Sequence, residues 1–140
     1  MRLGDNVLVH LCIPARATSL RLMRPVVSRA AELAGVNPEQ VERLVLAVNE
    51  AGMNVIQHAY GETRDGDLEL AIRDEGDDLV FVLIDHAPPI ALDRIQGRDL
   101  RDVRPGGLGV HFINEIMDRI DYSHLPDGQG NRLEMRKRIR

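Results

Sequence analysis

Two apolar segments joined by a short polar turn constrain the fold of this 140-residue chain more than any other feature. The first, LELAIR, begins at Leu68; the second, LVFVLID, ends at Asp85; EGDD lies between them. Apolar runs of this length bounded by turn residues are typical of strands, and the β-branched residues of the second suit a buried position. The sequence therefore predicts a β-hairpin whose second strand is buried.

The rest of the chain predicts three helices and three further strands. Alternating apolar residues indicate a strand over 7–13, which Pro14 ends. Helical periodicity follows from Thr18 or Ser19 to Gly35, with Pro25 as a candidate kink. The other expected elements are a helix from Asn37-Pro38 to about Tyr60, a short helix after the glycines near 107, and the strands DRIDYSH and NRLEMRKRI around a PDGQG turn.

These elements predict a two-layer α/β sandwich. Most strands are expected to pair with their sequence neighbours, and three helices are too few to cover both faces of a sheet. We therefore expect a mixed β-sheet with helices on one face. The length favours one domain spanning 1–140.

Composition narrows the range of functions. The formal net charge of −4 and an aromatic content of 3% disfavour direct binding to nucleic acid. Hydrophobic residues at 44% and charged residues at 29% are typical of a globular protein. No stretch approaches the ~20 apolar residues of a membrane span, and the first residues lack a signal peptide's apolar run, so no membrane contact and a cytoplasmic location are expected.

The helix predicted over 38–60 carries a polar stripe within NEAGMNVIQHAY. Glu50, Asn54 and His58 recur every four residues, so they lie along one tilted line on the helix. A carboxylate and an amide oxygen about one turn apart can share a magnesium ion or its waters. The alternative is an ordinary solvated helix side, and we expect His58 to be a structural or orienting residue.

Asp85 follows directly after the apolar strand LVFVLI. Its carboxylate is therefore expected at the floor of a cleft, where it can accept a hydrogen bond from an exocyclic amine such as that of adenine. A strand-terminal aspartate that caps a turn is the competing interpretation.

A glycine-rich motif precedes the last predicted helix. In Pro105-Gly106-Gly107-Leu108-Gly109 the glycines let backbone amides approach an anion, and a helix start near Gly109 adds its unpaired N–H groups. This arrangement predicts a phosphate-binding site, although glycine-rich turns also commonly serve only to join secondary-structure elements. It is not a Walker loop, because no Lys-Ser or Lys-Thr follows it.

With these three motifs in this order, the chain resembles the GHKL (Bergerat-fold) ATP-binding superfamily. Within it, the resemblance is to the small anti-sigma-factor serine/threonine kinases of bacterial partner switching. It covers nearly the whole chain, since LVLAVNEAGMNVIQHAY and GGLGVHFINEIMDRIDY look like that family's core helices and GNRLEMRK looks like its closing strand.

The resemblance implies a site for ATP and Mg²⁺ with assigned residue roles. Glu50 would be the general base, Asn54 the magnesium ligand and Asp85 the adenine-binding residue. The amides of Gly106, Gly107, Leu108 and Gly109 would hold the phosphates. The family's usual Asp-x-Gly pattern appears here as Asp85-His86-Ala87, so Ala87 stands where the glycine is usual and its methyl is expected beside the adenine pocket.

The resemblance also implies a function. We expect a kinase that phosphorylates a STAS-domain anti-anti-sigma protein, sequesters a sigma factor when not engaged with it, and forms a homodimer. The polar segment 91–105 would be a lid over the nucleotide. The alternative is a nucleotide-gated binding module that holds ATP and a protein without transferring phosphate.

Overall fold

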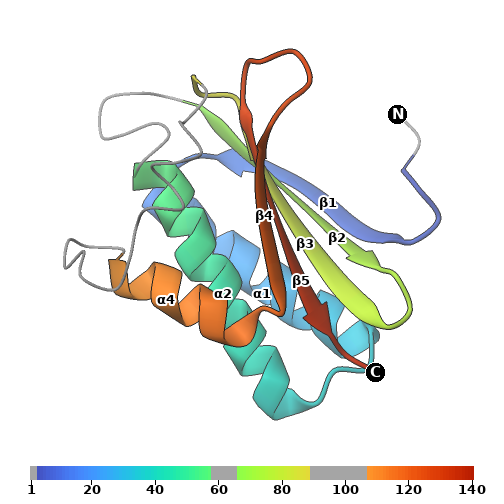
Figure 1. The fold of residues 1–140 in the computed structure, drawn as a ribbon. Coiled ribbons are helices and arrows are strands. Elements are labelled where there is room, and N and C mark those ends of the chain that lie inside the picture. Colours follow the sequence, from blue (N-terminus) through green and yellow to red (C-terminus); the bar gives the residue numbers. More distant parts are fainter. Residues whose placement is uncertain (1–2, 58–65, 89–106) are drawn as a thin grey trace.

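The computed structural model describes residues 3–57, 66–88 and 107–140, with only the backbone described for 107–111. Five strands form one sheet, and the described helices lie together on one side of it (Figure 1). In spatial order the strands are β1 (Val7–Pro14), β2 (Asp67–Asp74), β3 (Asp78–Asp85), β5 (Asn131–Arg138) and β4 (Arg119–His124).

The predicted two-layer α/β sandwich and the β2–β3 hairpin are confirmed, but the sheet is not mixed. Each pair of neighbouring strands is antiparallel. β3 and β4 do run in the same direction, because both are antiparallel to β5. However, the β4–β5 hairpin places β5 between them, so the two parallel strands never pair.

Within the described residues, three helices form the second layer: α1 (Leu20–Leu33), α2 (Pro38–Val55) and α4 (Gly107–Ile116). A short 3₁₀ turn, η1 (Ala17–Ser19), leads into α1, which continues through Pro25. The side chain of Asn37 caps α2 as predicted, accepting a bond from the Gln40 N–H at 2.9 Å. The α-helical part of α2 ends at Val55 and is followed by a π turn at 56–57; the predicted helix end near Tyr60 lies outside the described residues.

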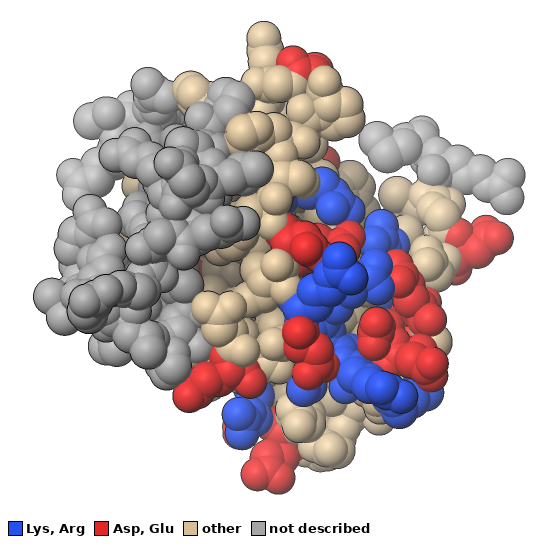
Figure 2. All heavy atoms as spheres, viewed as in Figure 1, with Lys and Arg blue, Asp and Glu red and all other residues tan. Residues whose placement is uncertain are grey.

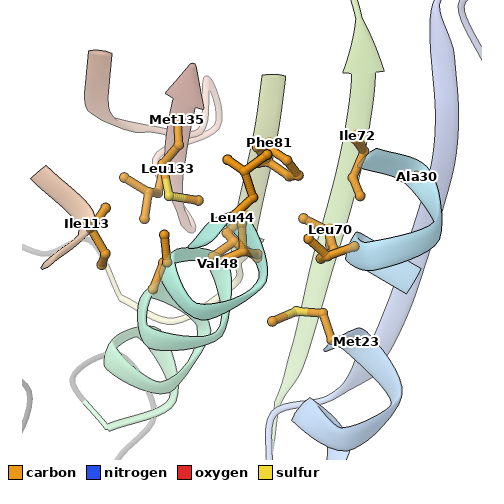
Figure 3. Close-up of a cluster of buried hydrophobic side chains, with 14 of the residues drawn as sticks. Met23, Ala30, Leu44, Val48, Leu70, Ile72, Phe81, Ile113, Leu133 and Met135 are labelled. Carbon is orange, nitrogen blue, oxygen red and sulfur yellow. The ribbon is translucent and has the colours of Figure 1, made fainter. Parts of the chain in front are cut away.

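The core lies between the two layers. Leu44 and Val48 of α2 point toward Phe81 and Leu70 of the sheet, and Met23 of α1 reaches the same cluster (Figure 3). All five side chains are at most 1% exposed. Complete burial of a side chain of this kind stabilises the fold by about 1.5–3 kcal/mol.

The other face of the sheet is covered by charged side chains. Glu134 lies at its centre and forms ion pairs with Arg73 at 3.3 Å, Arg132 at 3.0 Å and Arg136 at 3.1 Å. Acidic and basic side chains lie next to one another over the strands in Figure 2. Val80 and Val82 are buried without belonging to the main core. Their cross-strand neighbours include these charged residues, whose aliphatic stems cover them.

Within the described ranges, we find no helix that combines the length and the apolar character needed to cross a membrane.

Candidate nucleotide site

Asp85 ends β3 and points toward the helix layer, as the alternation of the strand requires. It is only 3% exposed. Its Oδ1 accepts bonds from the Ala87 N–H at 3.0 Å and from the Asn131 side-chain amide at 2.9 Å. Burial raises the pKa of Asp85, an effect that the bonds from Asn131 and Ala87 partly offset. A carboxylate has about four acceptor positions, so it retains capacity for a further donor.

The bond to Ala87 shows that Asp85 also caps a turn, as the competing interpretation proposed, because it spans two residues. Turn capping and ligand binding are compatible here, since one carboxylate can serve both. Ala87 itself is 3% exposed and belongs to the main hydrophobic core. Its methyl therefore packs into the core immediately beyond the aspartate.

The start of β5 fixes the position of Asp85. Asn131 is its cross-strand partner, and the Asn131 amide also donates to the Pro88 carbonyl at 3.3 Å. Gly130 comes directly before, and a Cβ at that position would collide with the Asp85 carbonyl oxygen and with Leu125. The β4–β5 turn can therefore approach the aspartate this closely only with glycine at 130.

On the opposite face of the sheet, Glu69 holds the chain just after Asp85. Its two carboxylate oxygens bond to the rings of His86 at 2.8 Å and His10 at 3.1 Å. The hydrogen bond with His86 is the main cause that lowers the pKa of Glu69. This contact links β1, β2 and the residue after β3 at the end of the sheet where Asp85 lies.

Glu50 and Asn54 lie in the last turns of α2 and are both half-buried. The Asn54 Oδ1 atom is buried, and no described residue hydrogen-bonds to it; the same is true of Asn49 Oδ1. A buried acceptor without a donor costs stability unless a ligand satisfies it. An unpaired amide oxygen one turn from a carboxylate fits a hard cation, so these residues are compatible with magnesium.

Gly52 brings this turn of α2 to the end of the sheet where Asp85 lies. A Cβ at Gly52 would lie 2.9 Å from Met23 Cε, 3.0 Å from Leu20 Cδ2 and 3.8 Å from Leu68 Cδ2. Leu68 is in turn the cross-strand partner of Asp85. The Glu50 and Asn54 motif and the aspartate motif, predicted separately, therefore occupy the same end of the sandwich.

Part of the glycine motif is described only as backbone. α4 begins at Gly107, so Gly107, Leu108 and Gly109 form its first turn, two residues earlier than predicted. The buried side chains of Ile113, Ile116 and Met117 belong to the main core, and α4 packs against α2. Gly106, His58 and the proposed lid at 91–105 lie outside the described residues.

Asn131 and Gly130 are the site residues that sequence reasoning missed. Their only signal is a Gly-Asn pair at the start of the last predicted strand. That pair becomes informative only when β5 is known to lie beside β3, a pairing between residues 46 positions apart.

The fold and this arrangement define a histidine kinase-like ATPase domain. The family model for that domain matches residues 13–137, and the chain belongs to this family. The predicted superfamily is thereby confirmed.

Among curated proteins, the chain is similar to serine-protein kinases named RsbW. It is 26% identical to that of Halalkalibacterium halodurans over 129 residues, covering 86% of this chain and 78% of the relative. It is 27% identical to that of Bacillus subtilis, covering 80% of this chain and 75% of the relative. The predicted resemblance to anti-sigma-factor kinases agrees with these relatives.

Solved structures with low sequence identity share the fold. The RsbU and RsbW domains of Rv1364c from Mycobacterium tuberculosis superpose with a TM-score of 0.65 at 13% identity. That match covers 94% of this chain and 31% of the other, so the chain spans about a third of that protein. A chain of the SiaB–SiaC complex from Pseudomonas aeruginosa gives a TM-score of 0.60 at 13% identity, covering 95% of this chain and 91% of the other.

Proposed function

We propose that the chain is an ATP-dependent protein serine/threonine kinase whose substrate is a STAS-domain anti-anti-sigma protein. When not engaged with that substrate, it sequesters a sigma factor in the cytoplasm. Membership of the ATPase family and similarity to proteins named serine-protein kinases support the reaction class. The likeness to a chain solved in a two-protein complex supports action on a protein partner.

The observation that carries the proposal is the buried, unpaired Oδ1 of Asn54, one turn from Glu50 and at the same end of the sandwich as Asp85. Asn54 would hold a magnesium ion, which would neutralise charge on the transferred phosphate. Asp85 accepts a hydrogen bond from the adenine amine. The backbone amides of Gly107, Leu108 and Gly109 at the start of α4, together with that of Gly106, would hold the phosphates.

In the proposed reaction Glu50 acts as general base. It takes the proton of the substrate serine or threonine hydroxyl, whose oxygen forms a bond to the γ-phosphorus. The bond between the γ-phosphorus and the bridging oxygen breaks, and ADP leaves with that electron pair. Because Glu50 acts on the hydroxyl and Asn54 on the bound nucleotide, substitutions at the two positions should have separable effects.

The proposal predicts that Glu50→Gln lowers single-turnover transfer of labelled phosphate by about 10²- to 10⁴-fold while ATP affinity is retained. Asn54→Ala should in addition weaken magnesium-dependent ATP binding in calorimetry. Glu42→Gln, an exposed acid on the same helix, and Asn49→Ala, the other buried unpaired amide, are the matched controls. Transfer by Glu50→Gln at the parent rate would exclude its catalytic role. ATP binding without any transfer by the wild-type chain would favour a nucleotide-gated binding module.

We also propose a homodimer. β1 lies at an edge of the sheet, where its outer backbone groups can pair with another strand. Light scattering at tens of micromolar protein tests this proposal, and a monomeric mass would contradict it.

A further inference from the structure

A glutamate with two histidine partners lies on the outer face of the sheet, at the end where Asp85 lies. Glu69 of β2 accepts hydrogen bonds from the rings of His86 at 2.8 Å and His10 of β1 at 3.1 Å, one through each carboxylate oxygen. In the strand register Glu69 is opposite Ile84, so His86 is the next residue along the chain that faces outward. We call Glu69, His10 and His86 the His–Glu–His cluster.

The cluster lies where the ladder of β3 ends. The pairs of Asp85 with Leu68 of β2 and with Asn131 of β5 are the last at this end of both registers. Strand ends open more readily than strand centres, because fewer contacts hold them. His86 is the first residue beyond these pairs, so its bond to Glu69 holds the chain at the position where backbone pairing stops.

Residues 85–87 are therefore held from both faces of the sheet. On the inner face, the Asp85 carboxylate accepts a bond from Asn131, and Ala87 is buried in the core. On the outer face, the half-exposed His86 ring is bonded to Glu69. A ligand-binding group must be held within about 0.5 Å of its binding position, and holding it there before binding lowers the cost of binding. Loosening the outer contact should thus weaken a ligand of Asp85 without removing any atom that touches it.

The cluster gains charge in the pH range where histidine rings take up a proton. The pKa of Glu69 is lowered, mainly by its hydrogen bond with His86, so its carboxylate stays ionised in that range. Histidine rings change charge between about pH 5 and pH 8, and a charged donor makes a stronger bond to a carboxylate than a neutral one. As pH falls from 8 to 6, the bonds of Glu69 to His86 and His10 should therefore strengthen.

The groups around the cluster do not reverse this change. Cys12 of β1 is the cross-strand partner of Glu69, and its pKa is raised, mainly by partial desolvation and then by the charges of Asp67 and Glu69, so the thiol stays neutral. Asp67 lies two residues before Glu69 on the same face of β2. Arg132 of β5 is bonded to Glu134 at 3.0 Å. Carboxylates and guanidinium groups ordinarily keep their charge across this pH range.

We propose that Glu69 is a positioning residue for Asp85, acting through His86, and that protonation of the His–Glu–His cluster tightens ATP binding. This inference rests on the proposed function, because Asp85 is the residue assigned there to the adenine amine. Since the side chains of His10 and His86 are 27% and 51% exposed, solvent screens their bonds, and the effect is modest. We expect the cluster to contribute about 3- to 5-fold in ATP affinity at pH 6 and less at pH 8.

Calorimetry of Mg-ATP binding to the full chain at pH 6 and pH 8 tests the proposal with three variants. Glu69→Gln should bind ATP about 3- to 5-fold more weakly than the wild type at pH 6, with a smaller difference at pH 8. His86→Gln keeps a hydrogen-bond donor but cannot ionise, so it should match the wild type at pH 8 and bind more weakly at pH 6. Glu134→Gln is the control and should bind as the wild type does, because it removes an outer-face carboxylate that is bonded to arginines at the centre of the sheet. Comparing each variant with the wild type at the same pH removes titrations common to both, such as that of ATP.

A second measurement separates positioning from stability. In the Asp85→Asn background, where ATP affinity is already low, Glu69→Gln should cause no further loss, because both changes act on one hydrogen bond. A residue that only supports the fold would weaken binding equally in both backgrounds. In steady-state kinetics, Glu69→Gln should raise KM for ATP and leave kcat unchanged.

Wild-type ATP affinity in Glu69→Gln at pH 6, or a pH dependence in His86→Gln equal to that of the wild type, would overturn the proposal. So would an equal loss from Glu69→Gln in the Asp85→Asn background, or an equal loss in Glu134→Gln. Absence of ATP binding by the wild type would overturn both this inference and the proposed function. ATP binding with the expected pH pattern but without phosphate transfer would support the positioning role, and only the kinase reaction would fail.

Discussion

The two layers of this sandwich differ in how their polar groups are paired. On the sheet, Glu134 binds three arginines and Glu69 binds two histidine rings. On the helix layer, Arg21 and Arg24 and the buried Oδ1 of Asn54 have no partner among the described residues. The carboxylates of Glu134 and Glu69 therefore stabilise the sheet, whereas these three groups of the helix layer are unpaired within the described part of the chain.

This difference matters because an unpaired polar group is costly only where it is buried. A buried acceptor without a donor costs about 1–3 kcal/mol, whereas an exposed arginine remains solvated at little cost. Asn54 Oδ1 and Arg21 are thus unpaired at different cost: the first is buried without a donor, whereas the second is exposed and solvated.

The largest expected effect is at Asp85, where the sheet meets the site. Asp85→Asn places a donor opposite the adenine amine and should weaken ATP binding by about 100-fold in calorimetry. Asp127→Asn is the matched control, because Asp127 caps a turn in the same way, accepting from the Gln129 N–H at 2.9 Å. Wild-type ATP affinity in Asp85→Asn, or equal affinities of the wild type for ATP and GTP, would remove Asp85 from its proposed role.

The same variant should not lose stability at neutral pH. Since the folded-state pKa of Asp85 is raised, its contribution to stability is present below the unfolded pKa and is lost as pH rises through the folded pKa. Because asparagine does not ionise, Asp85→Asn removes this pH-dependent loss of stability. In urea unfolding between pH 3 and pH 7, the free energy of unfolding of the variant, relative to that of the wild type, should rise with pH. A relative decrease with pH would contradict this.

The next effect tests how closely the sheet is built around the site. Gly130→Ala should lower the free energy of unfolding by about 3 kcal/mol, because the added methyl collides with the Asp85 carbonyl and Leu125. Gly128→Ala is the control: Gly128 has φ of +73° but open space around it, so only about 1 kcal/mol of backbone strain is expected. Equal losses in urea unfolding would show that the close approach is unimportant.

A smaller effect tests the ion pairs of the sheet. Glu134→Gln should cost about 1–2 kcal/mol at pH 7, since three arginines lose their shared carboxylate. Desolvation raises the pKa of Glu134, but hydrogen bonds from Arg132 and Arg136 outweigh it and leave the pKa below its ordinary value. The contribution is therefore present above the unfolded pKa and lost as pH falls through the folded pKa, so the variant and wild type should converge in acid.

Asp121→Asn controls for exposure, because the Asp121–Arg119 pair lies in solvent and should be worth only a few tenths of a kcal/mol. A loss in Asp121→Asn as large as that in Glu134→Gln would mean that burial of the carboxylate is irrelevant.

The smallest effect should have the opposite sign. Arg21→Glu exchanges an unfavourable for a favourable charge in the first turn of α1 and should raise the free energy of unfolding by about 0.5 kcal/mol. Chemical denaturation at low salt measures this change, which should shrink at high salt. Destabilisation by Arg21→Glu would show that Arg21 supports the fold and that the two layers are alike.

Local patterns in the sequence predicted the elements but not their spatial order. The Asn37 cap, the Gly35 stop and the β2–β3 turn depend on neighbouring residues, so the sequence alone identifies them. The placement of β5 between β3 and β4 depends on which distant strand fills the remaining edge of β3. For that reason the sheet was expected to be mixed and is antiparallel.

The residues of the candidate site fall into the same two groups: those marked by a local sequence pattern and those that depend on long-range pairing. Glu50, Asn54 and Asp85 are recognisable because each belongs to a local pattern of helix spacing or strand ending. Asn131 and Gly130 were missed because their contact with Asp85 exists only through the β3–β5 pairing. The unpaired state of Asn54 Oδ1 depends on packing and has no signature in the sequence.

The burial of β3 on both faces has a consequence during protein synthesis. Its partner β5 is encoded 46 positions later at the Asp85–Asn131 pair, so ribosomes elongating at about 5–20 residues per second leave one edge of β3 without a partner for roughly 2–9 seconds. During that interval Val80 and Val82 also lack the side chains of β5 that later cover them. The apolar run LVFVLI is thus most open to aggregation or chaperone capture while the nascent chain is still incomplete. Yield from overexpression should accordingly respond to translation speed and growth temperature.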